Sequence, residues 1–204
     1  SFDVVKNIRQ QIKPAKVGHA GTLDPFAEGV LMLCVGNKTK SIESFMDQEK
    51  EYITEIILGS ETDTLDMTGK IVKTAVIPML NKESIQNALS DFIGHIMQEP
   101  PMYSALKFNG LPLYKLARKG INIYRKKKAV IIYDIKLMDF TVDSMHLKVK
   151  CGRGTYIRSL ALDIAKSLGT VGYVKSLIRT RIGNFDEKAC ITIKEFPEWL
   201  SARI

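Results

Sequence analysis

Asp24 is the residue of this sequence best placed to do chemistry. It lies in the run GHAGTLDP, from Gly18 to Pro25, shortly before an apolar segment, Val30 to Val35, with the composition of a buried strand. Pro25 disfavours a helical backbone at Asp24, and the nearby glycines allow another chain or a ligand to approach closely. The run therefore predicts a carboxylate on a shaped loop at a sheet edge. The alternative interpretation of this run is an aspartate that only forms a turn or caps a helix, because Asp-Pro pairs favour turns.

The elements that must position this loop alternate irregularly between helices and strands. Apolar periodicity predicts helices over 4–12, 39–46, 81–94, 114–119 and 155–169, and strands over 29–36, 51–58, 71–72, 129–140 and 146–151. Asn81 and Thr155 are the expected N-caps of two helices, and Gly94 and Gly169 their expected ends. No regular strand-helix-strand cadence appears. The pattern favours an α+β fold with a mixed, mainly antiparallel sheet flanked by helices.

Length and composition indicate one soluble domain. The chain has 204 residues and is 45% hydrophobic, with no repeat and no linker rich in Gly, Ser or Pro. Its longest apolar run is far shorter than the roughly 20 residues of a membrane helix, so we expect no membrane association. Cys34, Cys151 and Cys190 lack the spacing of metal ligands, and we expect them to be reduced core residues of a cytoplasmic protein.

Basic residues gather in one stretch of the chain. Lys and Arg number 30 against 22 Asp and Glu, giving a formal charge of +8 that favours a polyanionic partner. The segment 100–133 contains no acidic residue. Its basic residues are Lys107, Lys115, Arg118, Lys119, Arg125, Lys126, Lys127 and Lys128. A nucleic-acid contact and a solvated basic loop both explain the run 125–128 taken alone.

Five sequence blocks together resemble one enzyme family. GHAGTLDP with the apolar run after it is similar to the signature motif of the TruB family of tRNA pseudouridine synthases, which modify the T-loop uridine. The other blocks follow in the family's order. They are KEY at 50–52, TDTLDMTG at 62–69, PPMYSALK at 100–107 and GTYIRSL at 154–160. The resemblance implies an isomerase with the pseudouridine synthase catalytic fold, in a single catalytic domain over 1–204.

The resemblance also assigns roles to residues around the target base. It makes Asp24 the catalytic carboxylate, acting as a nucleophile or assisting elimination, so that uracil leaves C1′, turns and rejoins through C5. Arg158 corresponds to the arginine that pairs with this carboxylate and fixes its orientation. Tyr52 corresponds to the aromatic residue that stacks on the flipped base and is a candidate for removing the C5 proton. Tyr156 and Leu177 correspond to residues that line the base pocket, although core packing is the far commoner explanation for an isolated Tyr or Leu in a strand.

Further matches concern the grip on RNA. His19 corresponds to the residue that fills the space vacated when the base flips out of the T-loop. The basic insertion near 100–133 resembles the RNA-gripping insertion of the family. Lys107 and the run Arg125, Lys126, Lys127 and Lys128 are then expected to contact phosphates, which gives affinity without reading sequence. Thr62, Asp63 and Asp66 lie in a loop for which turn formation is the default interpretation and contact with the RNA the alternative.

The implied partner is the T-stem-loop of tRNA, bound by a monomer that needs no metal and no organic cofactor. Family members normally begin with a strand and a Lys-Pro turn and end with an RNA-binding domain of the PUA type, and this chain contains neither. We therefore expect a weaker grip on the tRNA stem. A non-catalytic tRNA-binding or folding module is the alternative function. An aspartyl-phosphate enzyme is disfavoured because no phosphate-binding loop or magnesium-binding acidic pair is found.

Overall fold

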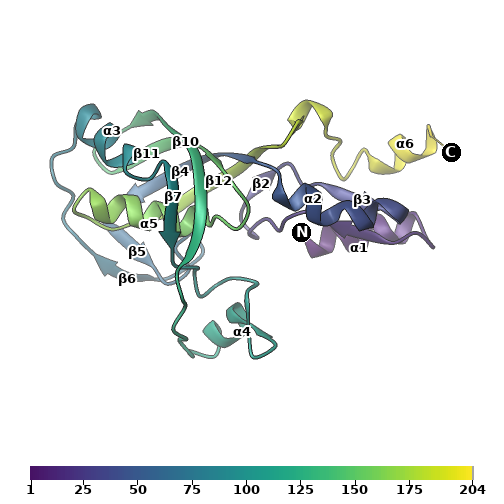
Figure 1. The fold of residues 1–204 in the computed structure, drawn as a ribbon, viewed down its shortest axis with the longest axis horizontal. Coiled ribbons are helices and arrows are strands. Elements are labelled where there is room, and N and C mark those ends of the chain that lie inside the picture. Colours follow the sequence, from purple (N-terminus) through teal and green to yellow (C-terminus); the bar gives the residue numbers. More distant parts are fainter. Residues whose placement is uncertain (204) are drawn as a thin grey trace. The chain divides into compact units, whose positions relative to one another are not determined.

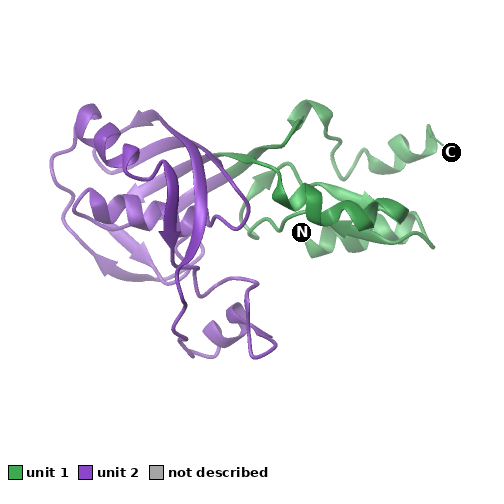
Figure 2. Ribbon diagram, viewed as in Figure 1, with its two compact units in different colours: residues 1–52, 178–204 green, residues 53–177 purple. Residues whose placement is uncertain are grey.

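The computed structural model describes residues 1–203, which form two compact units (Figure 2). Unit 1 comprises Ser1–Tyr52 with the segment from Ile178 onward, and unit 2 comprises Ile53–Leu177. Two strands, β4 (Lys50–Leu58) and β12 (Gly172–Ile182), contain the unit boundaries. No helix within the described residues is both long and apolar enough to cross a bilayer.

Unit 1 is built around the loop that carries Asp24. The helix α1 (Phe2–Gln11) buries Val5 and Ile8, and two strands, β1 (Val17–His19) and β3 (Leu33–Val35), pair antiparallel. Its other elements are β2 (Glu28–Gly29), η1 (Gly36–Ser41), α2 (Ile42–Asp47), β13 (Phe185–Asp186), η2 (Glu187–Ala189) and α6 (Phe196–Ser201). Within this unit β12 pairs antiparallel with β13 and parallel with β2.

Unit 2 contains the larger part of the sheet and its core. The strand order is β12-β4-β11-β10-β7, where β7 spans Gly94–Gln98, β10 Lys128–Phe140 and β11 Ser144–Cys151. Along β11 buried residues alternate with partly exposed ones, the pattern of a strand with one face in the core. The helix α5 (Ile157–Ser167) is mostly buried, and α3 (Lys82–Ser90) contacts both α5 and β10 (Figure 1).

Three small elements complete unit 2. The hairpin β5 (Ser60–Thr62) and β6 (Ile71–Thr74) encloses the TDTLDMTG block. The hairpin β8 (Lys107–Phe108) and β9 (Leu111–Pro112) leads into the short helix α4 (Leu113–Ala117). Figure 1 shows α4 and its loops projecting away from the sheet of this unit. The basic insertion is therefore an excursion between β7 and β10.

Most predicted elements are confirmed, together with the α+β class and the mainly antiparallel sheet. Asn81 caps α3 by accepting a hydrogen bond from the Ser84 backbone N–H at 2.8 Å, as predicted. Gly169 follows the last turn of α5 with a positive φ of 82°, also as predicted. Single-domain organisation stays a prediction.

Four local predictions are wrong. The expected strand over 29–36 is only Leu33–Val35, because Gly29 has a φ of 98° and ends a separate short strand. Thr155 does not cap α5, since its Oγ1 donates to the Gly152 carbonyl at 3.1 Å and Tyr156 holds the N-cap position. Gly94 opens β7 instead of ending α3. Cys190 is exposed, whereas Cys34 and Cys151 are buried as expected.

Candidate active site

The Asp24 loop leaves β1 and returns to β3 within unit 1. The backbone N–H of Ala27 donates to the Asp24 carbonyl at 3.0 Å, which closes a turn with Pro25 in its second position. The N–H of Leu23 donates to Ser1 Oγ at 2.9 Å. Asp24 itself is half-buried. The backbone thus forms the turn that the Asp-Pro pair favours. This turn fixes the position of the Asp24 Cα atom, from which the carboxylate side chain extends.

Arg179 fastens both ends of this loop. The residue is 1% exposed, its Nε donates to the Val30 carbonyl at 2.7 Å, and its Nη2 donates to the Gly21 carbonyl at 3.2 Å. The Arg179 carbonyl in turn accepts the Val30 N–H at 2.8 Å. A Cβ on Gly29 would lie 2.2 Å from the same carbonyl oxygen, so the strands meet this closely only with glycine. A buried guanidinium therefore braces the loop that carries Asp24.

His19 ends β1 opposite Leu33 of β3. Its Nδ1 is buried, and no residue in the described part of the chain shares a hydrogen bond with that atom. Burial, followed by the positive charge of Arg179, lowers the pKa of His19 from its usual 6.5. The ring is thereby kept neutral near pH 7, the form that stacks on a base with the smaller desolvation cost.

Tyr52, the third predicted residue of unit 1, is half-buried in β4. The first residue of its KEY block, Lys50, is buried, and its Nζ donates to the carbonyls of Met46 and, at 2.6 Å, Gln48. A lysine at the end of α2 satisfies carbonyls that the helix leaves without partners. Lys50 thus anchors the start of the strand that positions Tyr52.

Arg158 is held by three sequence blocks inside unit 2. Although charged, it is only 2% exposed. Its Nη1 donates to the Thr64 carbonyl at 2.8 Å, and its Nη2 donates to the Tyr103 carbonyl at 2.9 Å. Nη1 also lies 3.7 Å from Asp66 Oδ2. The TDTLDMTG, PPMYSALK and GTYIRSL blocks therefore meet at one guanidinium.

Asp66 organises the loop between β5 and β6. Its Oδ1 accepts the Thr64 hydroxyl at 2.8 Å and the Thr68 N–H at 2.9 Å. The loop is also joined to β12, since the Met67 N–H donates to the Val174 carbonyl and the Val174 N–H to the Leu65 carbonyl. The structure therefore gives Asp66 a structural role in this loop. Asp66 shapes this loop and supplies a carboxylate beside Arg158.

Tyr156 is positioned through its backbone by Gln98. The Tyr156 N–H donates to Gln98 Oε1 at 2.8 Å, and Gln98 Nε2 donates to the Tyr156 carbonyl at 3.1 Å. Gln98 is only 1% exposed, so neither of its groups has water as an easy substitute. Leu177, the other predicted pocket residue of this unit, is 5% exposed in β12.

The predicted phosphate contacts divide into exposed and engaged side chains. Lys107, Lys126, Lys127 and Lys128 are exposed. Arg125 is half-buried, pairs with the Glu99 carboxylate, and donates to the Asn122 side chain at 2.9 Å. Its guanidinium ties the basic insertion to the end of β7. Phosphate contact by all five residues stays a prediction.

Comparison with protein-family models accounts for almost the whole chain. Residues 9–157 match the model described as TruB family pseudouridylate synthase (N terminal domain). Residues 158–203 match the model described as tRNA pseudouridylate synthase B C-terminal domain. The chain belongs to the TruB family.

Curated relatives agree with this assignment to the TruB family. The tRNA pseudouridine synthase B of Francisella tularensis subsp. tularensis is 48% identical over 186 residues, which are 91% of this chain and 62% of that protein. The protein of the same name from Francisella philomiragia is 49% identical over the same shares. The chain therefore spans less than two thirds of the length of these relatives.

Solved structures share the TruB-family fold. A Cbf5-Nop10-Gar1 complex contains a chain with a TM-score of 0.73 and 26% identity, matched over 100% of this chain and 53% of that one. An archaeal box H/ACA sRNP Nop10-Cbf5 complex gives a TM-score of 0.70 at 22% identity, covering 100% of this chain and 52% of its match. The pseudouridine synthase fold expected from the sequence is confirmed.

Within this TruB-family chain, the predicted residues fall into two groups. Unit 1 carries His19, Asp24 and Tyr52, and unit 2 carries Tyr156, Arg158 and Leu177. Their meeting in one cleft stays a prediction. Sequence reasoning missed Arg179 and Gln98 as supporting residues. Arg179 could have been noticed as an arginine two positions after Leu177, hence on the same face of its strand, whereas nothing local to Gln98 marks its bond to a residue 58 positions away.

Proposed function

We propose that this chain forms the catalytic part of a tRNA pseudouridine synthase that isomerises uridine 55 of the T-loop, with Asp24 as its catalytic carboxylate. The observation that carries the proposal is the continuous match of residues 9–203 to the two TruB models. That match includes both Asp24 and Arg158. The named relatives are tRNA pseudouridine synthases, and this chain contains the five sequence blocks by which it resembles that family.

The proposed reaction needs a negatively charged group positioned beside the sugar or the base. In the proposed isomerisation the N1–C1′ bond breaks, the uracil turns, a C5–C1′ bond forms, and the C5 proton leaves while N1 gains one. A carboxylate suits this task because it is ionised at neutral pH and attacks or stabilises an electron-poor carbon. Arg158, fixed by two carbonyls, then orients Asp24 through opposite charge. This pairing is part of the proposal.

The base must leave its stack before this chemistry begins. In the proposed complex Tyr52 stacks on the flipped uracil, while Tyr156 and Leu177 enclose it. His19 fills the vacated place in the T-loop with a neutral ring, for which the unsatisfied, buried Nδ1 and the lowered pKa of His19 give support. The exposed lysines of the basic insertion hold the phosphates. We propose that the chain works as a monomer in the cytoplasm.

Hydrogen release from C5 tests the proposal. The chain is incubated with a T-stem-loop transcript labelled with tritium at uridine C5, and the product is digested and analysed for pseudouridine. The proposal predicts one equivalent of tritium released per RNA and pseudouridine only at the T-loop position. RNA binding without release or product would instead support the non-catalytic binding module.

A further inference from the structure

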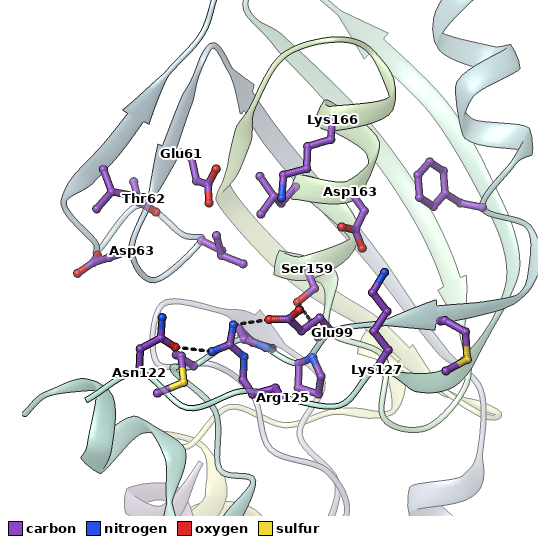
Figure 3. A pocket seen from close by; sticks show the side chains of 18 residues that line it. Glu61, Thr62, Asp63, Glu99, Asn122, Arg125, Lys127, Ser159, Asp163 and Lys166 are labelled. Carbon is purple, nitrogen blue, oxygen red and sulfur yellow. Dashed lines mark hydrogen bonds and ion pairs between the residues drawn. The ribbon is translucent and has the colours of Figure 1, made fainter. Parts of the chain in front are cut away.

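A cavity lies wholly inside unit 2. It has a volume of about 660 Å³ and lies between α5, the β5–β6 hairpin and the segments 99–102 and 122–127 (Figure 3). Volumes of roughly 300 to 1,000 Å³ are usual for small-molecule sites. None of the residues that the TruB resemblance assigns to the target base lines this cavity. The cavity is therefore distinct from the residues assigned to the target base, although Arg125 and Lys127, two predicted phosphate contacts, line it.

The cavity is lined by both apolar and polar side chains. The apolar ones are aliphatic, aromatic and proline side chains, which can pack against a planar ring. They are Leu65, Val72, Phe92, Met97, Pro100, Pro101, Met102 and Leu162. A few convergent polar groups beside an apolar surface are what fixes a ligand's orientation.

Asp163 is a carboxylate of this cavity without a hydrogen-bond or ion-pair partner among the described residues. It lies one turn beyond Ser159 on the cavity face of α5, and the Ser159 hydroxyl is already satisfied by the Glu99 carbonyl at 2.8 Å. No residue in the described part of the chain donates a hydrogen bond to the Asp163 carboxylate. Burial raises the pKa of Asp163, and the charges of Lys166 and Lys127 oppose that rise. A half-buried carboxylate of this kind gains most from an external donor.

Two cations face the same space. Figure 3 shows the Lys127 and Lys166 side chains directed into the cavity, with Lys127 reaching toward Asp163. Both lysines are exposed, and neither pairs with a carboxylate in the described chain. Arg125 and Glu99, by contrast, neutralise each other in the wall. Glu61 and Asp63 line the cavity on the side of the β5–β6 hairpin, so an anionic group on the ligand is favoured only on the side of the two lysines.

We propose that this cavity binds one guanine nucleotide, with Asp163 accepting hydrogen bonds from the base and Lys127 and Lys166 contacting its phosphate. An ionised carboxylate only accepts hydrogen bonds. Guanine presents two adjacent donors, N1–H and the N2 amino group, on its Watson–Crick edge. Adenine and cytosine place an acceptor beside their amino group, and uracil flanks its single N–H with two carbonyls, so each of these repels the carboxylate.

The nucleotide has two possible sources with the same chemistry. It is either a guanosine of the bound RNA, in which case the inference rests on the proposed function, or a free guanine nucleotide. Titration of the 204-residue chain with GMP, AMP, CMP and UMP tests the chemistry without requiring isomerisation. We expect GMP to bind at least about tenfold more tightly than the other three nucleotides, since a hydrogen bond to a charged group contributes roughly 1.5 to 3 kcal/mol.

Matched variants connect this preference to the cavity. Asp163→Asn should remove the preference for GMP. Lys166→Gln should lower the affinity for all four nucleotides by about the same factor. Lys82→Gln, on exposed α3, should change neither, and thermal melting confirms that each variant is folded. Equal binding of the four nucleotides by the unaltered chain, or an unchanged GMP preference in Asp163→Asn, overturns the proposal.

Inosine identifies the source, because it lacks the N2 amino group. Each guanosine of the T-stem-loop is replaced in turn, and affinity is measured for the unaltered chain and for Asp163→Asn. If one replacement weakens binding only when Asp163 is present, the nucleotide belongs to the RNA. If none does while GMP still binds, it is a free nucleotide. A chain that binds GMP but releases no C5 tritium would contradict the proposed isomerase while keeping this site.

Discussion

Arg158 Nη1 lies 3.7 Å from Asp66 Oδ2 in the interior of unit 2, and both side chains are almost completely buried. The same guanidinium donates to the carbonyls of Thr64 and Tyr103, so its position is set from three directions. Because removing one partner of a buried pair leaves an uncompensated charge, Asp66 and Arg158 depend on each other. In the proposed enzyme this arrangement presents Arg158 to Asp24.

Asp66→Asn isolates the charge of this pair. An asparagine keeps an Oδ1 for the Thr68 N–H, but its amide donors face the guanidinium. We expect C5 tritium release to fall about tenfold or more, which corresponds to about 1.4 kcal/mol of transition-state stabilisation. The control is Asp63→Asn, because Asp63 is exposed in the same loop and, among the described residues, its side chain accepts one hydrogen bond, from the Lys70 N–H. An equal decrease in tritium release in the two variants would show that the pairing of Asp66 with Arg158 does not contribute to catalysis.

Gln98→Leu tests how Tyr156 is positioned. Leucine fills similar space but leaves the Tyr156 N–H and carbonyl without the two hydrogen bonds that Gln98 provides. We expect the free energy of unfolding to fall by roughly 1 to 3 kcal/mol, mainly because the Tyr156 N–H loses its acceptor on Gln98, whereas the Tyr156 carbonyl keeps its hydrogen bond from the Leu160 N–H. Chemical denaturation measures this loss, and Gln86→Leu on the exposed face of α3 is the control. If both variants unfold at the same denaturant concentration, the bonds to Gln98 do not stabilise the fold.

Gly29→Ala tests the contact between β2 and β12. Gly29 has a φ of 98°, and an added Cβ would lie 2.2 Å from the Arg179 carbonyl oxygen. Gly110→Ala is a matched control, because Gly110 has a φ of 80° with nothing within 4 Å of its Cβ position. Backbone strain of roughly 1 to 3 kcal/mol applies to both, and the clash only to Gly29→Ala. Thermal unfolding should therefore show a clearly larger loss for Gly29→Ala, and equal losses would contradict the close approach.

The pH dependence of stability reports on His19. Its folded-state pKa is below the usual 6.5, chiefly because of burial. The unfolded chain therefore takes up the proton first as the pH falls, and stability is lost from about pH 6.5 down to the folded pKa, with no contribution from this group at higher pH. His19→Gln should reduce this acid-side loss in melting temperature measured between about pH 5 and 7.5. An unchanged profile would show that His19 is not the group responsible.

Local patterns predicted most elements because each buries one face. The alternation of buried residues along β11 and the apolar face of α5 both follow from packing against the core, so the sequence pattern predicts them. The strand β12 was not predicted, since the inward positions beside Leu177 include Arg179, and a basic residue interrupts the apolar alternation. The burial of that arginine is compensated by hydrogen bonds that it donates to loop carbonyls far away in sequence.

The candidate site was predictable only in part, for the same reason. Asp24, Tyr52 and Arg158 were identified from the resemblance of their motifs to the family. Local periodicity and residue propensity do not indicate a catalytic role for them. Their supporting bonds join distant positions, such as Arg158 to Thr64 across 94 residues. No local rule of spacing or propensity reports such a bond, because its energy exists only after the chain has folded.

Asp24→Asn is the most direct test of the central claim. Tritium release from the C5-labelled T-stem-loop is compared for the unaltered chain, Asp24→Asn and the exposed control Asp3→Asn, with RNA affinity measured in parallel. Because asparagine keeps the shape but removes the nucleophilic charge, release should fall by at least about a thousandfold, or about 4 kcal/mol, with affinity nearly unchanged. Release by Asp24→Asn at the rate of the unaltered chain would contradict the assignment of Asp24 as the catalytic carboxylate.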